Sequence, residues 1–78
     1  MSAFLLTATS DLRGRSVDDY DANVVDLARE PDTAGAGQGC YPDSCVREHR
    51  WVCKTATDAL TIAQVLIGVV DSLMIERR

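Results

Sequence analysis

The stretch 59–74 reads ALTIAQVLIGVVDSLM and contains one charged side chain, Asp71. Placed at about 100° per residue on a helix, its polar side chains fall on one narrow stripe, and apolar side chains cover the remaining ~220° of the circumference. A helix with this pattern requires burial on nearly all sides. The stretch therefore predicts a helix that packs against much more than one neighbouring element.

The rest of the chain offers little to cover such a helix. A chain of 78 residues buries only about 60% of the surface that its unfolded form exposes. We therefore expect a protein partner, most simply a second copy of the chain, which makes the protein a homodimer or higher oligomer. The expected contact residues are the apolar side chains of this stretch together with the single tryptophan: Leu60, Ile62, Leu66, Val69, Val70, Leu73 and Trp51.

A second, shorter helix is predicted over residues 17–29. Ser16 is a favourable N-cap, acidic residues follow it in the first turn, and apolar residues recur at helical spacing. Pro31 ends this helix because proline disfavours helical geometry in the residue before it. Residues 30–42 are rich in glycine and proline and read as a loop or linker. Residues 3–9 suit a short strand or an extended arm.

Residues 44–76 are predicted to form a helical hairpin or one bent helix. Asp43 or Ser44 can cap its beginning, and Thr55 followed by Asp58 resembles a second capping arrangement. Valine and isoleucine also suit a strand over 62–70, but strict alternation is absent there. The sequence therefore predicts a single small domain over 1–78 with a mainly α-helical fold.

The three cysteines and the only histidine lie within fourteen positions, as Cys40, Cys45, His49 and Cys53. Three thiolates and an imidazole form a complete tetrahedral zinc set. On a helix, the last three would follow one another at successive turns on one side. A zinc-stabilised recognition module is therefore one alternative function.

The same residues have a second interpretation, in which they only pack. On a helix, Val46 and Val52 share the face of Cys45, His49 and Cys53, and free cysteine packs as a small hydrophobic residue. A disulfide is a third interpretation. Only Cys40 could then pair, because eight helical residues separate the other two Cα atoms by about 12 Å.

Charge and hydropathy narrow the range of partners. The chain has 8 basic and 12 acidic side chains, a net charge of −4, which argues against a nucleic acid or an anionic membrane surface. A helix over 59–75 would reach about 25 Å, short of the ~30 Å hydrocarbon core of a bilayer. The first residues include no basic segment of the kind that begins a signal peptide, so we expect a cytoplasmic protein with reduced cysteines.

No residue pattern specifies a reaction, so the sequence predicts a small acidic protein that is not an enzyme and has a binding or structural role. A further alternative is a ribosomally made precursor peptide, with an acidic leader, an Ala-Gly-Ala-Gly junction at 34–37 and a cysteine-containing core. No cofactor other than zinc is expected.

Overall fold

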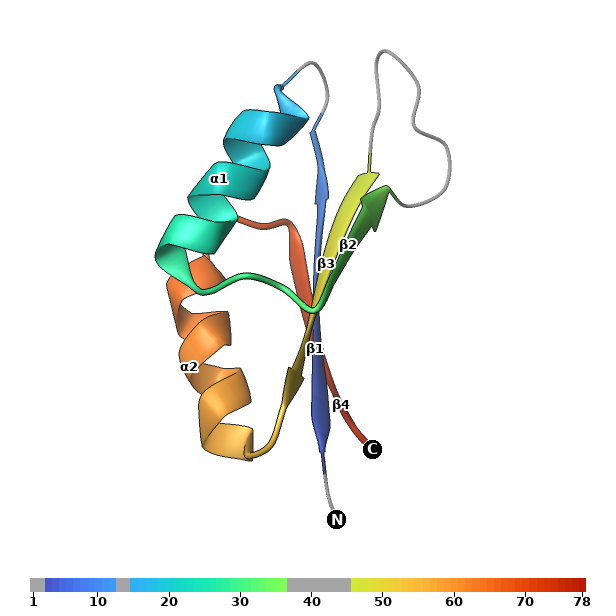
Figure 1. Cartoon of the computed structure of the whole chain (residues 1–78), viewed down its shortest axis with the longest axis vertical. Helices are drawn as coiled ribbons and strands as arrows, with labels where there is room; N and C mark the ends of the chain where they lie inside the picture. Colours follow the sequence, from blue (N-terminus) through green and yellow to red (C-terminus); the bar gives the residue numbers. More distant parts are fainter. Residues whose placement is uncertain (1–2, 13–14, 37–45) are drawn as a thin grey trace.

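The computed structural model describes residues 3–12, 15–36 and 46–78. It contains one four-stranded antiparallel sheet with the strand order β2-β3-β1-β4. Both helices lie on the same face of this sheet (Figure 1). The elements follow one another as β1 (Phe4–Asp11), α1 (Val17–Leu27), β2 (Thr33–Ala36), β3 (Val46–Cys53), α2 (Ala56–Leu66) and β4 (Ser72–Arg77). This is the split βαβ topology. The prediction of a mainly α-helical fold is therefore wrong, and the protein is an α+β domain.

The first part of the chain follows the sequence prediction. Strand β1 covers the segment predicted as a short strand, and α1 begins after Ser16, whose Oγ accepts a hydrogen bond of 3.3 Å from the backbone N–H of Asp19. This bond satisfies one of the free N–H groups at the start of the helix. Helix α1 ends two residues before the predicted limit of 29, and Ala28 is its C-cap.

The predicted helix over 44–54 is wrong because Val46–Cys53 is strand β3. It pairs along its whole length with β1, with Trp51 opposite Leu6 and His49 opposite Ala8. Its side chains alternate in the way that a strand requires: His49, Trp51 and Cys53 are buried, whereas Arg50 and Val52 are exposed. The odd-numbered residues of β3 face the helices, and the even-numbered residues face the open side of the sheet.

Helix α2 is shorter than the stretch that predicted it. Thr55 is its N-cap, as expected, and the Oγ1 atom of Thr55 accepts a hydrogen bond of 3.1 Å from the N–H of Asp58. Gly68 ends the helix by adopting a φ of 88°, a conformation that favours glycine. The N–H groups of Val69 and Val70 then turn back to the carbonyl of Leu66, at 2.9 and 3.2 Å.

The end of the apolar stretch forms strand β4, and the prediction that helix continues to 76 is therefore wrong. The turn is fixed by Asp71, whose N–H donates to the Thr9 carbonyl at 3.1 Å and to Ser10 Oγ at 3.0 Å. Strand β4 then runs antiparallel to β1 without a register shift, from Ser72 opposite Thr9 to Arg77 opposite Phe4. The sheet order makes β4 an edge strand.

Part of the predicted loop over 30–42 also belongs to the sheet. Residues Thr33–Ala36 form β2 and pair with β3, so most of the Ala-Gly-Ala-Gly junction lies in a strand. Residues 37–42 lie outside the described part of the chain.

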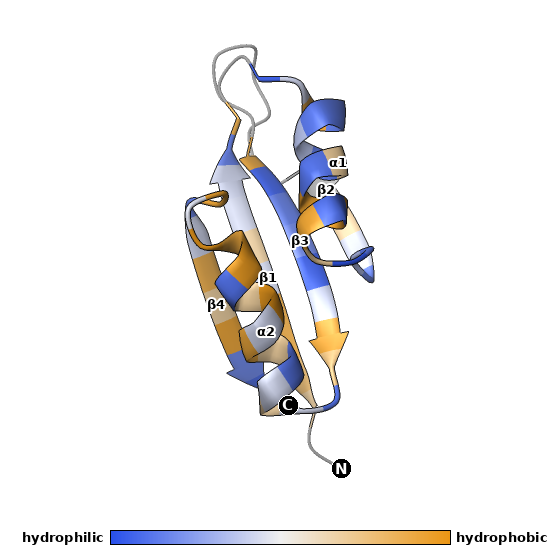
Figure 2. Ribbon diagram, turned by 90° about the vertical axis from the view of Figure 1, so that its left-hand side faces the viewer, coloured by the Kyte–Doolittle hydropathy of each residue, from blue (hydrophilic) through white to orange (hydrophobic). Residues whose placement is uncertain are grey.

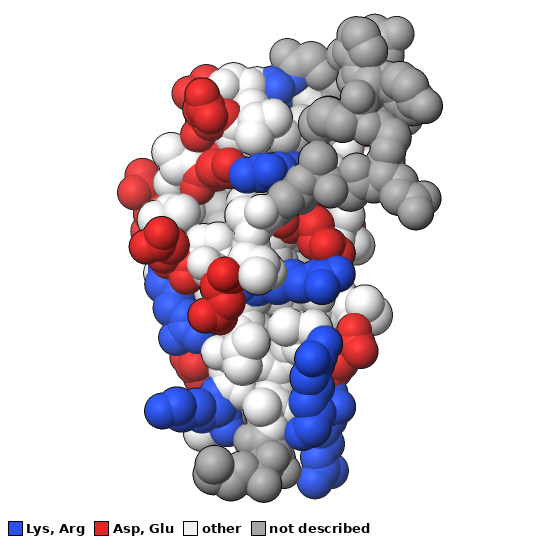
Figure 3. All heavy atoms as spheres, turned by 45° about the vertical axis from the view of Figure 1, so that its right-hand side comes forward, with Lys and Arg blue, Asp and Glu red and all other residues white. Residues whose placement is uncertain are grey.

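The core lies between the sheet and the two helices. Leu6 and Trp51 contribute from the sheet, Val24 from α1 and Leu66 from α2, and each is completely buried. Neither α1 nor α2, the two helices of the described residues, covers the opposite face of the sheet. Acidic and basic side chains are interspersed over the surface that Figure 3 shows, and Arg50 and Glu48 of β3 form an ion pair of 3.1 Å on this face.

Candidate functional site

The structure separates the four predicted zinc ligands. Cys40 and Cys45 lie outside the described residues, whereas His49 and Cys53 are buried on the inward face of β3, with exposures of 1% and 0%. The predicted helical ladder is wrong because the segment is a strand. Over residues 3–12, 15–36 and 46–78, no group of three or more His, Cys, Asp or Glu side chains is placed to hold a metal. No metal site is therefore seen among the residues that the structure describes, and His49 Nε2 binds another side chain.

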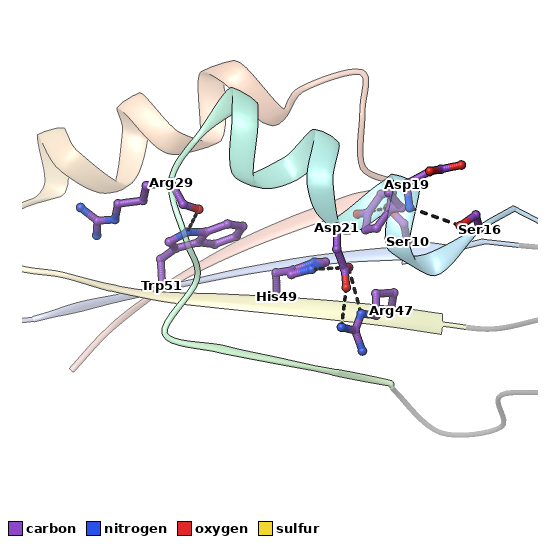
Figure 4. A network of polar contacts seen from close by, with 9 residues as sticks. Ser10, Ser16, Asp19, Asp21, Arg29, Arg47, His49 and Trp51 are labelled. Atoms are coloured by element: carbon purple, nitrogen blue, oxygen red, sulfur yellow. Dashed lines mark hydrogen bonds and ion pairs between the residues drawn. The ribbon is translucent and has the colours of Figure 1, made fainter.

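That partner is Asp21 of α1. The carboxylate accepts a hydrogen bond of 2.8 Å from His49 Nε2. The guanidinium of Arg47 binds the same carboxylate with two bonds, from Nε at 3.1 Å and from Nη2 at 2.7 Å. Figure 4 shows Asp21 reaching down from α1 between the two β3 side chains. We call Asp21, Arg47 and His49 the Asp21 cluster. It ties the middle of α1 to β3 through charge-assisted hydrogen bonds.

Aromatic rings lie on both sides of the imidazole. The centroid of the Tyr20 ring is 5.5 Å from that of His49, and the Trp51 centroid is 6.1 Å from it. Each flanking ring also has a hydrogen bond of its own: the Tyr20 hydroxyl donates to Ser10 Oγ at 2.9 Å, and Trp51 Nε1 donates to the Arg29 carbonyl at 3.1 Å. The imidazole is therefore held in a nearly closed environment.

This environment determines the protonation of His49. A carboxylate only accepts hydrogen bonds, so Nε2 carries the proton and Nδ1 is the unprotonated nitrogen. His49 Nδ1 is buried without a hydrogen-bond partner, so protonating it would create a buried donor with nothing to bind. Burial lowers the pKa of His49, and the neighbouring Asp21 carboxylate offsets only part of that effect.

The pKa of Asp21 is lowered although its carboxyl group is partly buried. Burial alone would raise the pKa of the carboxyl group. The hydrogen bonds and positive charge of Arg47, with the contact to His49, outweigh burial and hold the pKa of Asp21 below its ordinary value. The cluster therefore contains a carboxylate, a guanidinium and a neutral imidazole at pH 7.

Cys53 is not an activated thiol. It is completely buried, and burial raises the pKa of its thiol group, with Asp58 adding to the effect. The thiolate is the nucleophilic form of cysteine, so this shift lowers its reactivity. The guanidinium of Arg29 lies 3.9 Å from the sulfur, but its charge does not overcome the burial.

The predicted contact residues divide into two groups. Trp51, Ile62 and Leu66 are buried inside the fold, with exposures of 0%, 5% and 0%. Trp51, which the sequence predicted as a contact residue, lies in β3 and faces the core. The remaining members are exposed or half-buried: Leu60, Val69, Val70 and Leu73.

An exposed apolar surface lies along β4 and the adjacent flank of α2. Its most exposed members are Leu60 at 54%, Ile67 at 70%, Met74 at 54% and Ile75 at 40%. We call these four residues together with Leu73 the apolar edge. Figure 2, which views the molecule from the helix side, shows α2 in front of β1 and β4, and α1 in front of β3.

The positions of Leu60 and Ile67 on α2 follow from helical geometry. At about 100° per residue, Asp58 lies ~90° to one side of the buried face of α2, and Leu60 and Ile67 lie ~90–110° to the other. Asp58 forms an ion pair of 3.3 Å with Arg29, which follows α1, so its flank faces α1. The flank with Leu60 and Ile67 therefore faces the β4 edge of the sheet.

A surface depression of about 450 Å³ lies beside the start of α1. It contains no pair of side chains arranged as nucleophile and base. Its lining residues are Arg15, Ser16, Asp19, Tyr20, Asn23 and Val69.

Comparisons with known proteins leave the site to be interpreted from its geometry. No protein-family model, curated protein or solved structure matches the chain. Among the described helices, none is both long and apolar enough to cross a membrane.

Proposed function

We propose that this protein is a small, non-enzymatic structural or binding protein that self-associates through the apolar edge. The observation that supports it most strongly is that β4 is an edge strand whose Met74 and Ile75 side chains are 54% and 40% exposed. Leu60 and Ile67 of α2 extend the same surface. Contiguous exposed apolar surface on a soluble protein is typical of a contact site.

The strand itself has few of the features that prevent edge-to-edge contact. Natural edge strands are commonly protected by lysine, by proline or by a bulge. Strand β4 has the sequence SLMIER, which contains neither lysine nor proline, and its register with β1 is regular throughout. Its charged residues, Glu76 and Arg77, stand only at its end.

A non-enzymatic role is supported by the Asp21 cluster. Its carboxylate binds two partners in the same chain, and its imidazole is 1% exposed, so neither group is presented to a substrate. General acid–base catalysis requires a side chain within hydrogen-bond reach of the reacting group. The cluster instead has the arrangement of a support that holds α1 on the sheet.

Sedimentation velocity over a range of micromolar concentrations tests the proposal. The wild type should sediment as an assembly that dissociates on dilution. Ile75→Lys should remain monomeric at every concentration, because it places a charge in the proposed contact. Val25→Lys is the matched control, since Val25 is an equally exposed residue, at 40%, on α1; this variant should assemble like the wild type.

Two outcomes would contradict the proposal. A wild type that sediments as a compact monomer at all concentrations would show that the apolar edge is not a self-association surface. Equal loss of assembly in Ile75→Lys and Val25→Lys would show that added charge, rather than this surface, controls association.

A further inference from the structure

We propose that two copies of the chain pair their β4 strands antiparallel about a two-fold axis at Met74, which joins the two four-stranded sheets into one. This inference rests on the proposed self-association and specifies its geometry. The partner is a second copy in one register, and the argument has three parts: the backbone of β4, the residues that each register places opposite one another, and the flank of α2.

The backbone of β4 presents free hydrogen-bonding groups at the edge. Ala3 and Arg78 exchange both of their hydrogen bonds, at 3.1 and 2.7 Å. In an antiparallel pair such doubly bonded residues alternate with residues whose N–H and C=O point away from the neighbour. The register then directs the N–H and C=O groups of Leu73, Ile75 and Arg77 away from β1, where a second strand can bind them.

Charge and hydrophobicity select the register. With Met74 opposite the Met74 of the other copy, Leu73 lies opposite Ile75, and this apolar pair occurs twice by symmetry. Asp71, just before β4, then comes opposite Arg77. Its carboxylate already accepts a hydrogen bond of 2.8 Å from the Asp11 N–H of β1, so this pair of opposite charges adds to the contact only through the remaining carboxylate oxygen. Apolar pairs and opposite-charge pairs across two strands are the favourable combinations.

The neighbouring registers lack these pairs. An axis at Ile75 would place Leu73 opposite Arg77 and Met74 opposite Glu76, an apolar residue against a charge in both cases. An axis at Glu76 would place the two Glu76 carboxylates opposite each other, which is destabilising. A register shift by a single residue would place the helices of the two copies on opposite faces of the joined sheet.

The flank of α2 adds a second layer to the same contact. The odd-numbered residues of β4 face the helices, because Ile75 is opposite Leu6 and Leu73 is opposite Ala8, both in the core. A two-fold axis at Met74 therefore places the Leu73 and Ile75 side chains of both copies on the helix side of the joined sheet. Leu60 and Ile67 stand on the flank of α2 that faces this edge. The contact would thus bring together Leu60, Ile67, Leu73 and Ile75 on the helix side, while the two Met74 side chains meet on the open face of the joined sheet.

Disulfide trapping distinguishes the registers. In the proposed dimer, the Cα atoms of the two residues at position 74 are about 4.5 Å apart, within the range that a disulfide spans, whereas the two residues at 75 are beyond about 7 Å. Under mild oxidation by oxidised glutathione, Met74→Cys should become predominantly a covalent dimer. Ile75→Cys should form no more covalent dimer than the wild type, which controls for the native cysteines.

Amide hydrogen exchange on the wild type gives an independent test that needs no substitution. At a total concentration about tenfold above the dissociation constant, about a fifth of the chains remain monomeric, so the outward N–H groups of Leu73, Ile75 and Arg77 should exchange about fivefold more slowly than in the dilute monomer. If the assembly used the open sheet face or the helices instead, these three amides would exchange at the same rate in both states.

Each contrary outcome has its own meaning. Covalent dimer from Ile75→Cys but not from Met74→Cys would overturn the register. An assembly in sedimentation with neither cross-link nor protected outward amides would overturn strand pairing but leave the proposed function intact. A monomeric wild type at all concentrations would overturn both.

Discussion

The Asp21 cluster and the apolar edge reverse the usual placement of side chains. Beneath α1, the Asp21 carboxylate and the Arg47 guanidinium are partly buried, with side-chain exposures of 28% and 20%, and the His49 imidazole is 1% exposed. Along β4, by contrast, Met74 and Ile75 are 54% and 40% exposed. Buried charges persist only when they are paired, and exposed apolar surface is reduced by association. The groups of the first region find their partners within one chain, whereas the second is the surface that we propose a second copy covers.

The two regions should therefore respond differently to substitution, and the largest effect is expected in the Asp21 cluster. Asp21→Ala removes the shared acceptor of Arg47 and His49 and leaves both donors without their partner, which should lower the free energy of unfolding by about 2–4 kcal/mol. Urea denaturation measures this change. Asp26→Ala, at an exposed position of the same helix, is the control and should change stability by less than about 0.5 kcal/mol. Similar losses of unfolding free energy in both variants would show that the Asp21 cluster does not stabilise the fold more than an exposed side chain does.

Acidification should weaken the same cluster by a smaller amount. The unfolded chain protonates His49 near the ordinary pKa of 6.5, whereas the folded protein does so only at lower pH. The unfolded state therefore binds more protons in this window, and the free energy of unfolding should fall as pH decreases below about 6.5. Asp21, whose pKa is also lowered, should add a second loss below its ordinary value of 3.8.

Urea denaturation at a series of pH values measures both windows. His49→Gln, which keeps an N–H donor but does not titrate, should remove the pH dependence between about 6.5 and the folded pKa, and should keep the loss at lower pH. An unfolding free energy that rises on acidification in the wild type would contradict the lowered pKa of His49.

The caps of the helices should have intermediate effects and test whether α1 depends on local signals as well as on the Asp21 cluster. Ser16→Ala removes the acceptor for the Asp19 N–H and Thr55→Ala removes that for Asp58, so each should cost about 1 kcal/mol. Thermal or urea unfolding measures the cost. Ser16→Asp provides a control because it retains an acceptor and should preserve most of the stability. If the alanine variants equal the wild type, the caps are not formed in solution.

The smallest effect on folding is expected at the apolar edge. In dilute solution, Ile75→Lys should change the free energy of unfolding by less than about 1 kcal/mol, because the edge of a monomer is solvated. Association stabilises the folded state by mass action, so the wild-type melting temperature should rise with protein concentration. That of Ile75→Lys should not. If the melting temperatures of both proteins were independent of protein concentration, the apolar edge would not be a self-association surface.

The sequence predicted the elements that local signals define. The caps at Ser16 and Thr55 mark the starts of the two helices, and Pro31 lies just beyond the end of α1. Strand β3 was missed because Cys45, His49 and Cys53 are spaced by four residues, and an even spacing places side chains on one face of a strand as well as of a helix. The charges between them concealed the alternation.

The end of α2 and the partner of His49 were missed for different reasons. Gly68 lies within the stretch predicted as one long helix, yet glycine is also the commonest residue just beyond the end of a helix. Asp21 lies only about 20° beyond the apolar stripe of α1, nearer to it than the other aspartates, which was the one local sign of its role. Its partners belong to β3, and their approach depends on tertiary structure that a single sequence does not specify.

The sheet order has a consequence for how the chain acquires its structure. Strands β1 and β2 belong to the first half of the chain, yet β3 lies between them; β3 and β4 belong to the second half, yet β1 lies between them. Among the described strands, neither half contains two that pair with each other, so β1 and β2 have no described strand to pair with until β3 and β4 are present. Completing the sheet therefore requires contacts distant along the sequence, those of β1 with β3 and β4, and topologies rich in such contacts fold more slowly than those built from local contacts. Strands from the two halves of the chain alternate across the sheet, so each half supplies the neighbouring strands with which the other half pairs.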